Sequence, residues 1–250
     1  MAVLGAAAPV QPAGAAPEAA VLTQDSPFGA VRAHAGIRDG ESVRARAARA
    51  ADELVAEGGL TREHVVVVVP TGSGWVNPNL VAGLEERFGD EVATVAVQYD
   101  TAPSWWAYLA HREQAEEGAR EAVTAVLARV RTLPEDERPQ VHVVSESLGA
   151  TAGQTVFTDE VRRQVCSALW VGSPGGQVAG LPREASVANE DDPVVHSSLQ
   201  DLVVPRDDGR WVPAVGAVHG AADFLGSLEV PDGAGHRYGP DIADALPPCD

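Results

Sequence analysis

The sequence predicts an α/β domain with a mostly parallel central sheet and helices on both of its faces. Short runs of β-branched residues alternate with longer stretches of helical periodicity, which is the pattern of strands joined by crossover helices. The run from Val65 to Val69 is apolar at every position, as expected for a strand buried on both faces. With 250 residues and 45% hydrophobic content, the chain can bury one sizeable core, so we expect a single such domain.

Residues 1–25 are rich in alanine and proline and carry no charge before Glu18. We interpret them as a flexible segment, either a linker or the remnant of a longer precursor. They lack the basic start and the unbroken apolar centre of a signal peptide. The folded domain is therefore expected to occupy residues 26–250, and no apolar run in it is long enough to span a bilayer, so the chain is expected to be soluble as given.

The first half of the domain is expected to alternate between helices and strands in chain order. In the longest predicted helix, alanine and valine recur along one stripe, with glutamate and arginine on the opposite side. A charged, proline-flanked loop at 134–139 closes that helix. The predicted helices are 42–57, 80–88 and 111–131, and the predicted strands are 65–69 and 92–99.

The apolar run 141–144 leads directly into Ser145-Glu146-Ser147-Leu148-Gly149. A strand that turns at once into a helix at a serine, with small residues two positions to either side, is typical of a nucleophile elbow, because strand and helix approach closely there. The pentapeptide also fits a plain helix N-terminus capped by Ser145 or Ser147. The elbow interpretation makes Ser147 the candidate nucleophile.

Two further strands are predicted at 168–171 and 185–188, and the acidic cluster Glu190-Asp191-Asp192-Pro193 follows the second of them. In an enzyme with such an elbow the triad acid lies in a loop after a later strand, which is the place of Asp192. The alternative is a solvated turn initiated by Asp-Pro, which describes Glu190 and Asp191. We take Asp192 as the candidate acid.

Seven histidines compete for the role of general base. The favoured one is His236, which lies in a glycine-rich loop between Gly233 and Gly239, where an imidazole can reach both Ser147 and Asp192. A surface histidine in a turn is the structural alternative. The other histidines are excluded because each lies in a predicted strand or helix, before the loop at 70–75, or too close to the acid. They are His34, His64, His111, His142, His196 and His219.

Charge and cysteine content exclude several classes of partner and cofactor. All 18 basic residues are arginine, against 36 acidic residues, which gives a formal charge of −18 and disfavours nucleic acid as a partner. No group of cysteines and histidines has metal-ligand spacing, and Gly72-Ser73-Gly74 lacks the third glycine of a dinucleotide loop, so we expect neither metal nor cofactor. Cys166 is expected to be a buried thiol and Cys249 an exposed one; a bridge between them is the alternative, because termini often fold back on a domain.

Several blocks, in order from about Val31 to the end of the chain, resemble an actinobacterial family of α/β-hydrolases. In that family a membrane-associated, serine esterase-like catalytic domain often follows a multi-pass membrane segment. The blocks are Pro70-Thr71-Gly72-Ser73-Gly74-Trp75-Val76-Asn77-Pro78, Val95-Ala96-Val97-Gln98-Tyr99 with Pro103-Ser104-Trp105, Glu146-Ser147-Leu148-Gly149, Leu169-Trp170-Val171-Gly172, Asp192-Pro193-Val194-Val195 and Gly235-His236-Arg237-Tyr238-Gly239.

The resemblance implies an α/β-hydrolase fold with Ser147, Asp192 and His236 as catalytic triad. The chain departs from the family pattern in two ways. Only a short Gly/Pro-rich link joins Gly172 to the acid loop, so we expect little or no cap domain and an open site. The membrane segment is absent from this chain, so any membrane association would depend on a part not included here, and the localisation cannot be carried over from relatives.

The implied reaction is cleavage of a small-molecule carboxylic ester through an acyl-enzyme. The backbone N–H of Leu148 is the first expected oxyanion donor, and Thr71 or Gly72 the second; a tight turn that only packs Trp75 is the structural alternative for that loop. Trp75, Trp105 and Trp106 are candidate substrate contacts and favour an apolar or lipid-like acyl or alkyl group. The alternatives are an acyltransferase with the same triad and a non-catalytic binding module on this fold.

Overall fold

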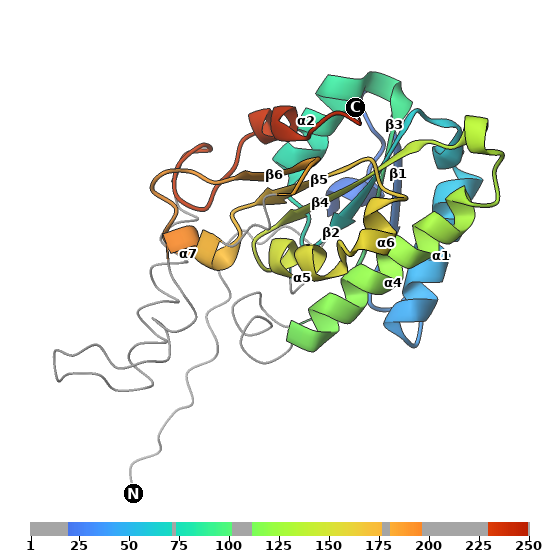
Figure 1. The fold of residues 1–250 in the computed structure, drawn as a ribbon, viewed down its shortest axis with the longest axis horizontal. Helices are drawn as coiled ribbons and strands as arrows, with labels where there is room; N and C mark the ends of the chain where they lie inside the picture. Colours follow the sequence, from blue (N-terminus) through green and yellow to red (C-terminus); the bar gives the residue numbers. More distant parts are fainter. Residues whose placement is uncertain (1–19, 72–73, 102–111, 177–180, 197–229, 250) are drawn as a thin grey trace, which may run out of the picture.

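The computed structural model describes residues 20–71, 74–101, 112–176, 181–196 and 230–249. Within them one sheet holds six parallel strands in the order β1-β3-β2-β4-β5-β6 (Figure 1). The predicted α/β class is confirmed, and all the described strand pairs are parallel. The strands are β1 (Val31–Ala35), β2 (His64–Val69), β3 (Val92–Val97), β4 (Gln140–Glu146), β5 (Ser167–Val171) and β6 (Glu184–Val187).

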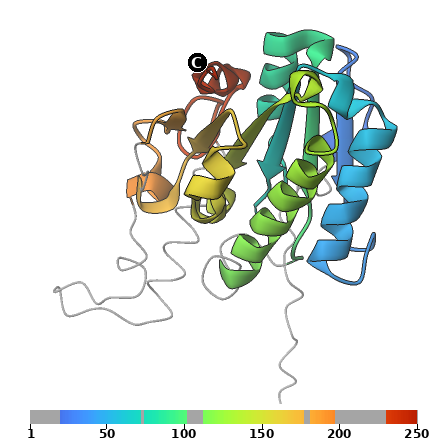
Figure 2. The same cartoon turned by 45° about the vertical axis from the view of Figure 1, so that its right-hand side comes forward.

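Helices cover both faces of the sheet (Figures 1 and 2). One face packs against α1 (Val43–Ala56), α4 (Arg112–Val130) and α5 (Leu148–Val156). The other packs against α2 (Pro78–Phe88) and the 3₁₀ helix η6 (Pro240–Ala245), next to which Leu22 of η1 (Ala20–Thr23) is also buried. The helices predicted at 42–57, 80–88 and 111–131 are thus present, with small shifts at their ends.

The apolar run of β2 is buried on both faces, as the sequence predicts. Val65, Val67 and Val69 enter the core under α1 and α4, whereas Val66 and Val68 enter the core under α2. Each face of a β-strand takes alternate residues, so a strand between two helical layers must be apolar throughout.

Strand β1 is an element that the sequence analysis missed. Its burial alternates along Val31–Ala35, and Arg32 and His34 occupy the less buried positions, so it lacks the continuous apolar run that marks the inner strands. Arg32 instead donates to both carboxylate oxygens of Glu85 on α2, at 2.7 and 2.8 Å. This fully buried glutamate fastens the edge strand to the helix.

Other sequence expectations fall differently. The acid loop continues into a one-turn helix, α7 (Pro193–His196), because proline suits a first helical turn. Short α6 (Asp159–Arg162) was not predicted either. Residues 1–19 of the proposed flexible segment lie outside the described residues, and so does His219. None of the described helices is both long and apolar enough to cross a bilayer.

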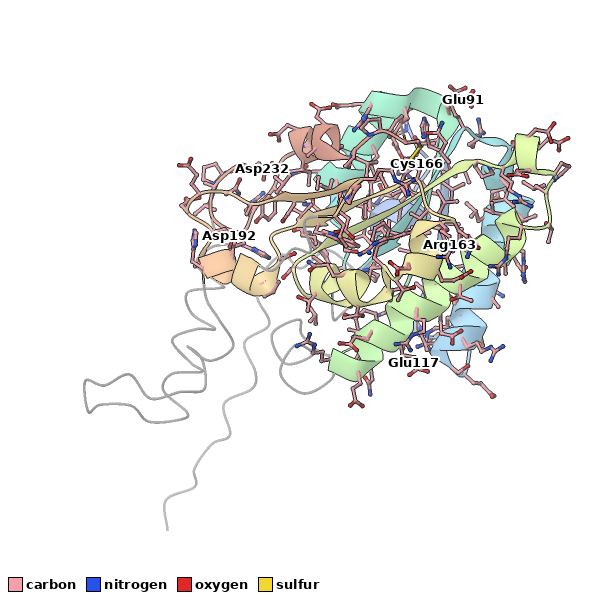
Figure 3. The ribbon with its side chains drawn as sticks, viewed as in Figure 1. Glu91, Glu117, Arg163, Cys166, Asp192 and Asp232 are labelled. Atoms are coloured by element: carbon pink, nitrogen blue, oxygen red, sulfur yellow. A yellow bond between two sulfur atoms is a disulfide. The ribbon has the colours of Figure 1, made fainter. Side chains whose placement is uncertain are left out.

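The expectation of two separate thiols is wrong. Cys166 and Cys249 form a disulfide with a Cα–Cα distance of 4.8 Å, across a sequence separation of 83 residues (Cys166 is labelled in Figure 3). The physical reason is that η6 packs along α2 and returns the chain end to the start of β5, where the Ser167 hydroxyl donates to the Pro247 carbonyl at 2.6 Å.

A chain of buried and part-buried hydrogen bonds runs beside this disulfide. The Ser167 hydroxyl donates to Pro247, so it accepts from Nδ1 of His142 at 2.9 Å, and Nε2 of His142 accepts from Nδ1 of His64 at 3.1 Å. Burial, reinforced by the nearby His64 and Arg87, lowers the pKa of His142 to about 3. His142 is therefore a neutral hydrogen-bonding group at neutral pH.

Reduction of the disulfide should lower the free energy of unfolding by about 4 to 5 kcal/mol, because cross-linking residues this far apart removes much of the entropy of the unfolded chain. Urea unfolding of oxidised and reduced protein measures the difference. The Cys166→Ser/Cys249→Ser double variant should resemble reduced wild type and should not respond to reductant. Equal midpoints for oxidised and fully reduced wild type would contradict the prediction.

Acidification should destabilise the fold through His142. Its folded-state pKa of about 3 lies below the ordinary value of 6.5, so between these values the unfolded chain binds a proton that the folded chain does not. Stability is therefore fully present above pH 6.5 and is lost as the pH falls toward 3, by at most about 1.4 kcal/mol per pH unit for one proton. Urea midpoints between pH 7 and 4 should fall less steeply in His142→Gln, which does not titrate; parallel slopes would refute this origin.

Candidate active site

Ser147 lies between the last residue of β4 and the first residue of α5, in a strained backbone conformation. Its φ of 57° and ψ of −126° lie in a region that residues with a side chain rarely adopt. Its N–H donates to the carbonyl of Val171 on β5 at 2.8 Å, and the residue is 6% exposed. The turn therefore has the geometry expected of a nucleophile elbow.

Close packing around Ser147 explains the small residues on either side. A Cβ atom on Gly149 would lie 2.3 Å from the carbonyl oxygen of Val69, so only glycine lets α5 approach β2. Ser145 is fully buried, and its Oγ lies 2.6 Å from where a Cβ on Gly153 would be. Larger residues at these three positions would push the helix away from the sheet.

Asp192 and His236 are joined by a hydrogen bond of 2.8 Å between Oδ2 and Nδ1. Both are buried, at 0% and 4% exposure. The Tyr238 hydroxyl also donates to Oδ2 of Asp192, and the Val194 N–H at the start of α7 donates to Oδ1 at 2.8 Å. Burial opposes ionisation of this carboxyl, but the hydrogen bonds from His236, Tyr238 and Val194 outweigh it and lower the pKa of Asp192, which is therefore ionised at neutral pH.

The acid loop, residues 188–192, also holds the backbone of the C-terminal loop, residues 233–239. Asp191 accepts from the Gly235 N–H at 2.9 Å, and Asn189 donates to the carbonyls of Gly235 and Arg237 at 2.9 and 3.0 Å. Asp191 therefore has a structural role beside the candidate acid. Figure 3 shows Asp192 beside α7, at the same end of the sheet as this loop.

Gly172 provides the space in which the imidazole lies next to the elbow. It follows Val171, whose carbonyl binds Ser147, and its φ of 56° favours glycine. A Cβ at this position would lie 2.8 Å from Cε1 of His236 and 2.6 Å from the Tyr238 hydroxyl. The structure thus brings His236 to the β5 end at which Ser147 is anchored, and among the described histidines it is the one hydrogen-bonded to Asp192, whereas His196 contacts Glu190.

The expected oxyanion donors are only partly described. Leu148 is the first residue of α5, where backbone N–H groups have no acceptor within the helix. The Thr71 N–H donates to the Trp75 carbonyl at 3.2 Å, so in this structure it closes the loop's own turn. Gly72, Trp105 and Trp106 lie outside the described residues, and Trp75 is half-buried.

Sequence reasoning missed the buried side chain of Glu146. Its Oε2 accepts from the Asn77 side chain at 2.8 Å, and the residue is 6% exposed. Burial raises the pKa of this carboxyl to about 7, against the opposing effects of His236 and Asn77. The sequence signal was available, because an acidic residue that ends an apolar inner strand next to a candidate nucleophile must be buried.

Within the described part of the chain, one group of side chains has ligand atoms close enough to meet at a metal ion. His142, Cys166 and Cys249 lie within 4.8 Å of one another. The two sulfur atoms are joined in the disulfide, and both ring nitrogens of His142 are hydrogen-bonded. This donor set does not fit a metal site.

Residues 31–204, more than half of the chain, match the alpha/beta-hydrolase family. None of the curated proteins is significantly similar to the sequence. Among solved structures, the chain is similar to a Trichoderma reesei cutinase in complex with a C11Y4 phosphonate inhibitor. The identity is 12% and the TM-score 0.43, over 65% of this chain and 82% of the cutinase.

Proposed function

The chain belongs to the alpha/beta-hydrolase family, and on this basis we propose that it is a serine hydrolase of carboxylic esters with Ser147, His236 and Asp192 as triad. The observation that carries the proposal is the buried Asp192–His236 hydrogen bond next to a serine on a strained strand-to-helix turn. The catalytic unit is proposed to be residues 26–250, with Leu22 of the preceding segment packed against its core. A narrower kinship with membrane-associated esterases stays a prediction from the sequence.

The hydrogen bond to Asp192 fixes which nitrogen of His236 acts. Ionised Asp192 accepts the proton on Nδ1, which leaves the lone pair on Nε2. Ser147 Oγ attacks the ester carbonyl as its proton passes to Nε2, and the imidazolium then protonates the departing alcohol. In the second half of the reaction, water gives its proton to Nε2 of His236 as it attacks the acyl-enzyme. The acyl–Oγ bond then breaks, the carboxylic acid leaves, and Ser147 Oγ takes the proton back from His236.

Negative charge on the tetrahedral oxygen requires donors that are already in place, each worth a few kcal/mol of transition-state stabilisation. We assign one to the Leu148 N–H. Of the two candidates for the second, Gly72 is favoured over Thr71, because the Thr71 N–H donates to Trp75. An apolar or lipid-like group on a neutral ester is proposed on the basis of Trp75, Trp105 and Trp106, and the charge of −18 disfavours anionic polymers such as nucleic acid.

A fluorophosphonate probe should label wild-type protein on Ser147, because the probe reacts with an activated serine, and peptide mass spectrometry locates the adduct. Ser147→Ala should not be labelled. Ser145→Ala, which changes the other serine of the elbow, should keep the label. Folded wild-type protein that takes no label would instead favour a binding module. With an ester substrate, transfer of the acyl group to an added alcohol rather than water would favour the acyltransferase.

Asp192→Asn should reduce ester turnover by about 10⁴-fold while leaving the sheet and its helices intact, because an amide at this place holds the imidazole in the wrong tautomer. Turnover and far-ultraviolet circular dichroism measure the two effects. Asp191→Asn is the matched control: it keeps an oxygen for the Gly235 N–H and should keep most of the activity. Full activity in Asp192→Asn would move the role of acid to another carboxylate.

A further inference from the structure

The mechanism proposed above leaves one buried ionisable group at the site without a role. Glu146 immediately precedes Ser147 and is 6% exposed. Burying a carboxyl beside an ionised aspartate is unfavourable, since it adds a second acidic group to a site of low dielectric. A neutral side chain would fill the same space at lower cost, so the position calls for a physical explanation.

The strand register shows where the Glu146 side chain lies. Glu146 pairs with Val171 on β5, as Val144 pairs with Leu169, and paired residues of parallel strands share a face. Val144, Leu169 and Val171 all pack with Tyr238 under α2. Glu146 therefore lies beside Val171, on the face of the sheet that packs against the C-terminal loop.

Asn77 connects this carboxyl to the C-terminal loop. Its Nδ2 donates to Glu146 at 2.8 Å and lies 3.5 Å from the Tyr238 carbonyl, while its Oδ1 caps α2 by accepting from the Asn79 N–H at 2.9 Å. Since the Tyr238 hydroxyl donates to Asp192, Glu146 and Asp192 approach the segment 236–238 from two sides. Glu146 comes from β4 and Asp192 from the loop after β6.

We propose that Glu146 is a positioning residue whose carboxylate, held by Asn77, stabilises the His236 imidazolium and makes the proposed reaction depend on the ionisation of Glu146. This role rests on the proposed function. The ionised form places a second negative charge near the imidazolium that forms when Ser147 attacks. The protonated form is neutral and lacks that attraction, while the Asp192 contact with Nδ1 is unchanged.

The groups around Glu146 put this ionisation within reach of ordinary pH. Burial is the largest influence and raises its pKa to about 7; His236 and the Asn77 amide act in the opposite direction, and Asp192 acts in the same direction as burial. The groups that face the carboxyl are thus His236 and Tyr238 from the C-terminal loop, Asp192 from the acid loop and Asn77 from the α2 cap. Above pH 7 the carboxylate predominates, and below it the acid.

The test is the second-order rate of fluorophosphonate labelling at Ser147 as a function of pH, in wild type and Glu146→Gln. Glutamine keeps an oxygen for Asn77 but no charge. The ratio of variant to wild-type rate should be near one below about pH 6, where both side chains are neutral, and should fall to roughly one tenth to one third above about pH 8, as expected for the loss of a nearby charge. The exposed Glu160→Gln should give a ratio of one throughout.

Two further measurements separate charge from structure. Asn77→Ser keeps a capping oxygen for α2 but removes the donor to Glu146, so the activating step in its own labelling profile should move to higher pH. In ¹³C-glutamate-labelled Ser147→Ala protein, one carboxyl resonance should titrate near pH 7, which tests the ionisation even if Glu146→Gln does not fold.

The outcomes are distinguishable. Wild type that takes no label at any pH would overturn the proposed function and this role with it. Labelled wild type with a Glu146→Gln ratio that is the same at every pH would leave the triad standing and reduce Glu146 to a packing residue. A glutamate spectrum in which every carboxyl titrates below about pH 5.5 would also overturn the inference.

Discussion

The buried negative charge of Asp192 is the constraint on which the arrangement of the site depends. An uncompensated carboxylate with no exposed surface would cost several kcal/mol, so donors must surround it. There are three donors: the Val194 N–H at the start of α7, and the side chains of His236 and Tyr238, which lie 44 and 46 residues after Asp192. The C-terminal loop is therefore placed by the charge that it balances, and the same contact orients the imidazole for the proposed chemistry.

The remaining geometry follows from how closely the central elements pack. Gly149 lets α5 approach β2, and Gly172 leaves the space that the His236 ring and the Tyr238 hydroxyl fill. The disulfide and η6 hold the far end of the segment that carries His236. His236 and Ser147 are thus brought together at the carboxyl ends of β4 and β5 by elements that are fixed on both sides, which is what a preorganised site requires.

Local patterns in the sequence were enough to predict most of the fold and to select Asp192 and His236, which are hydrogen-bonded in the structure. The apolar run of β2 and the small residues around Ser147 reflect constraints between residues that are close in the sequence. Such constraints can therefore be recognised from the sequence alone. Contacts between distant segments could not be read in this way. Strand β1 is stabilised by the pair Arg32–Glu85 across 53 residues, the Asn77–Glu146 contact spans 69, and the disulfide depends on the path of η6. The hydrogen bond that occupies the Thr71 N–H also depends on loop geometry that composition does not specify.

The backbone conformation of Ser147 also affects the stability of the fold. A non-glycine residue held at this φ and ψ raises the energy of the folded state by about 1 to 3 kcal/mol, and glycine at the same place would relieve most of that strain. Serine at this position therefore costs folding free energy that glycine would recover, so stability and the proposed chemistry make opposing demands on the same residue.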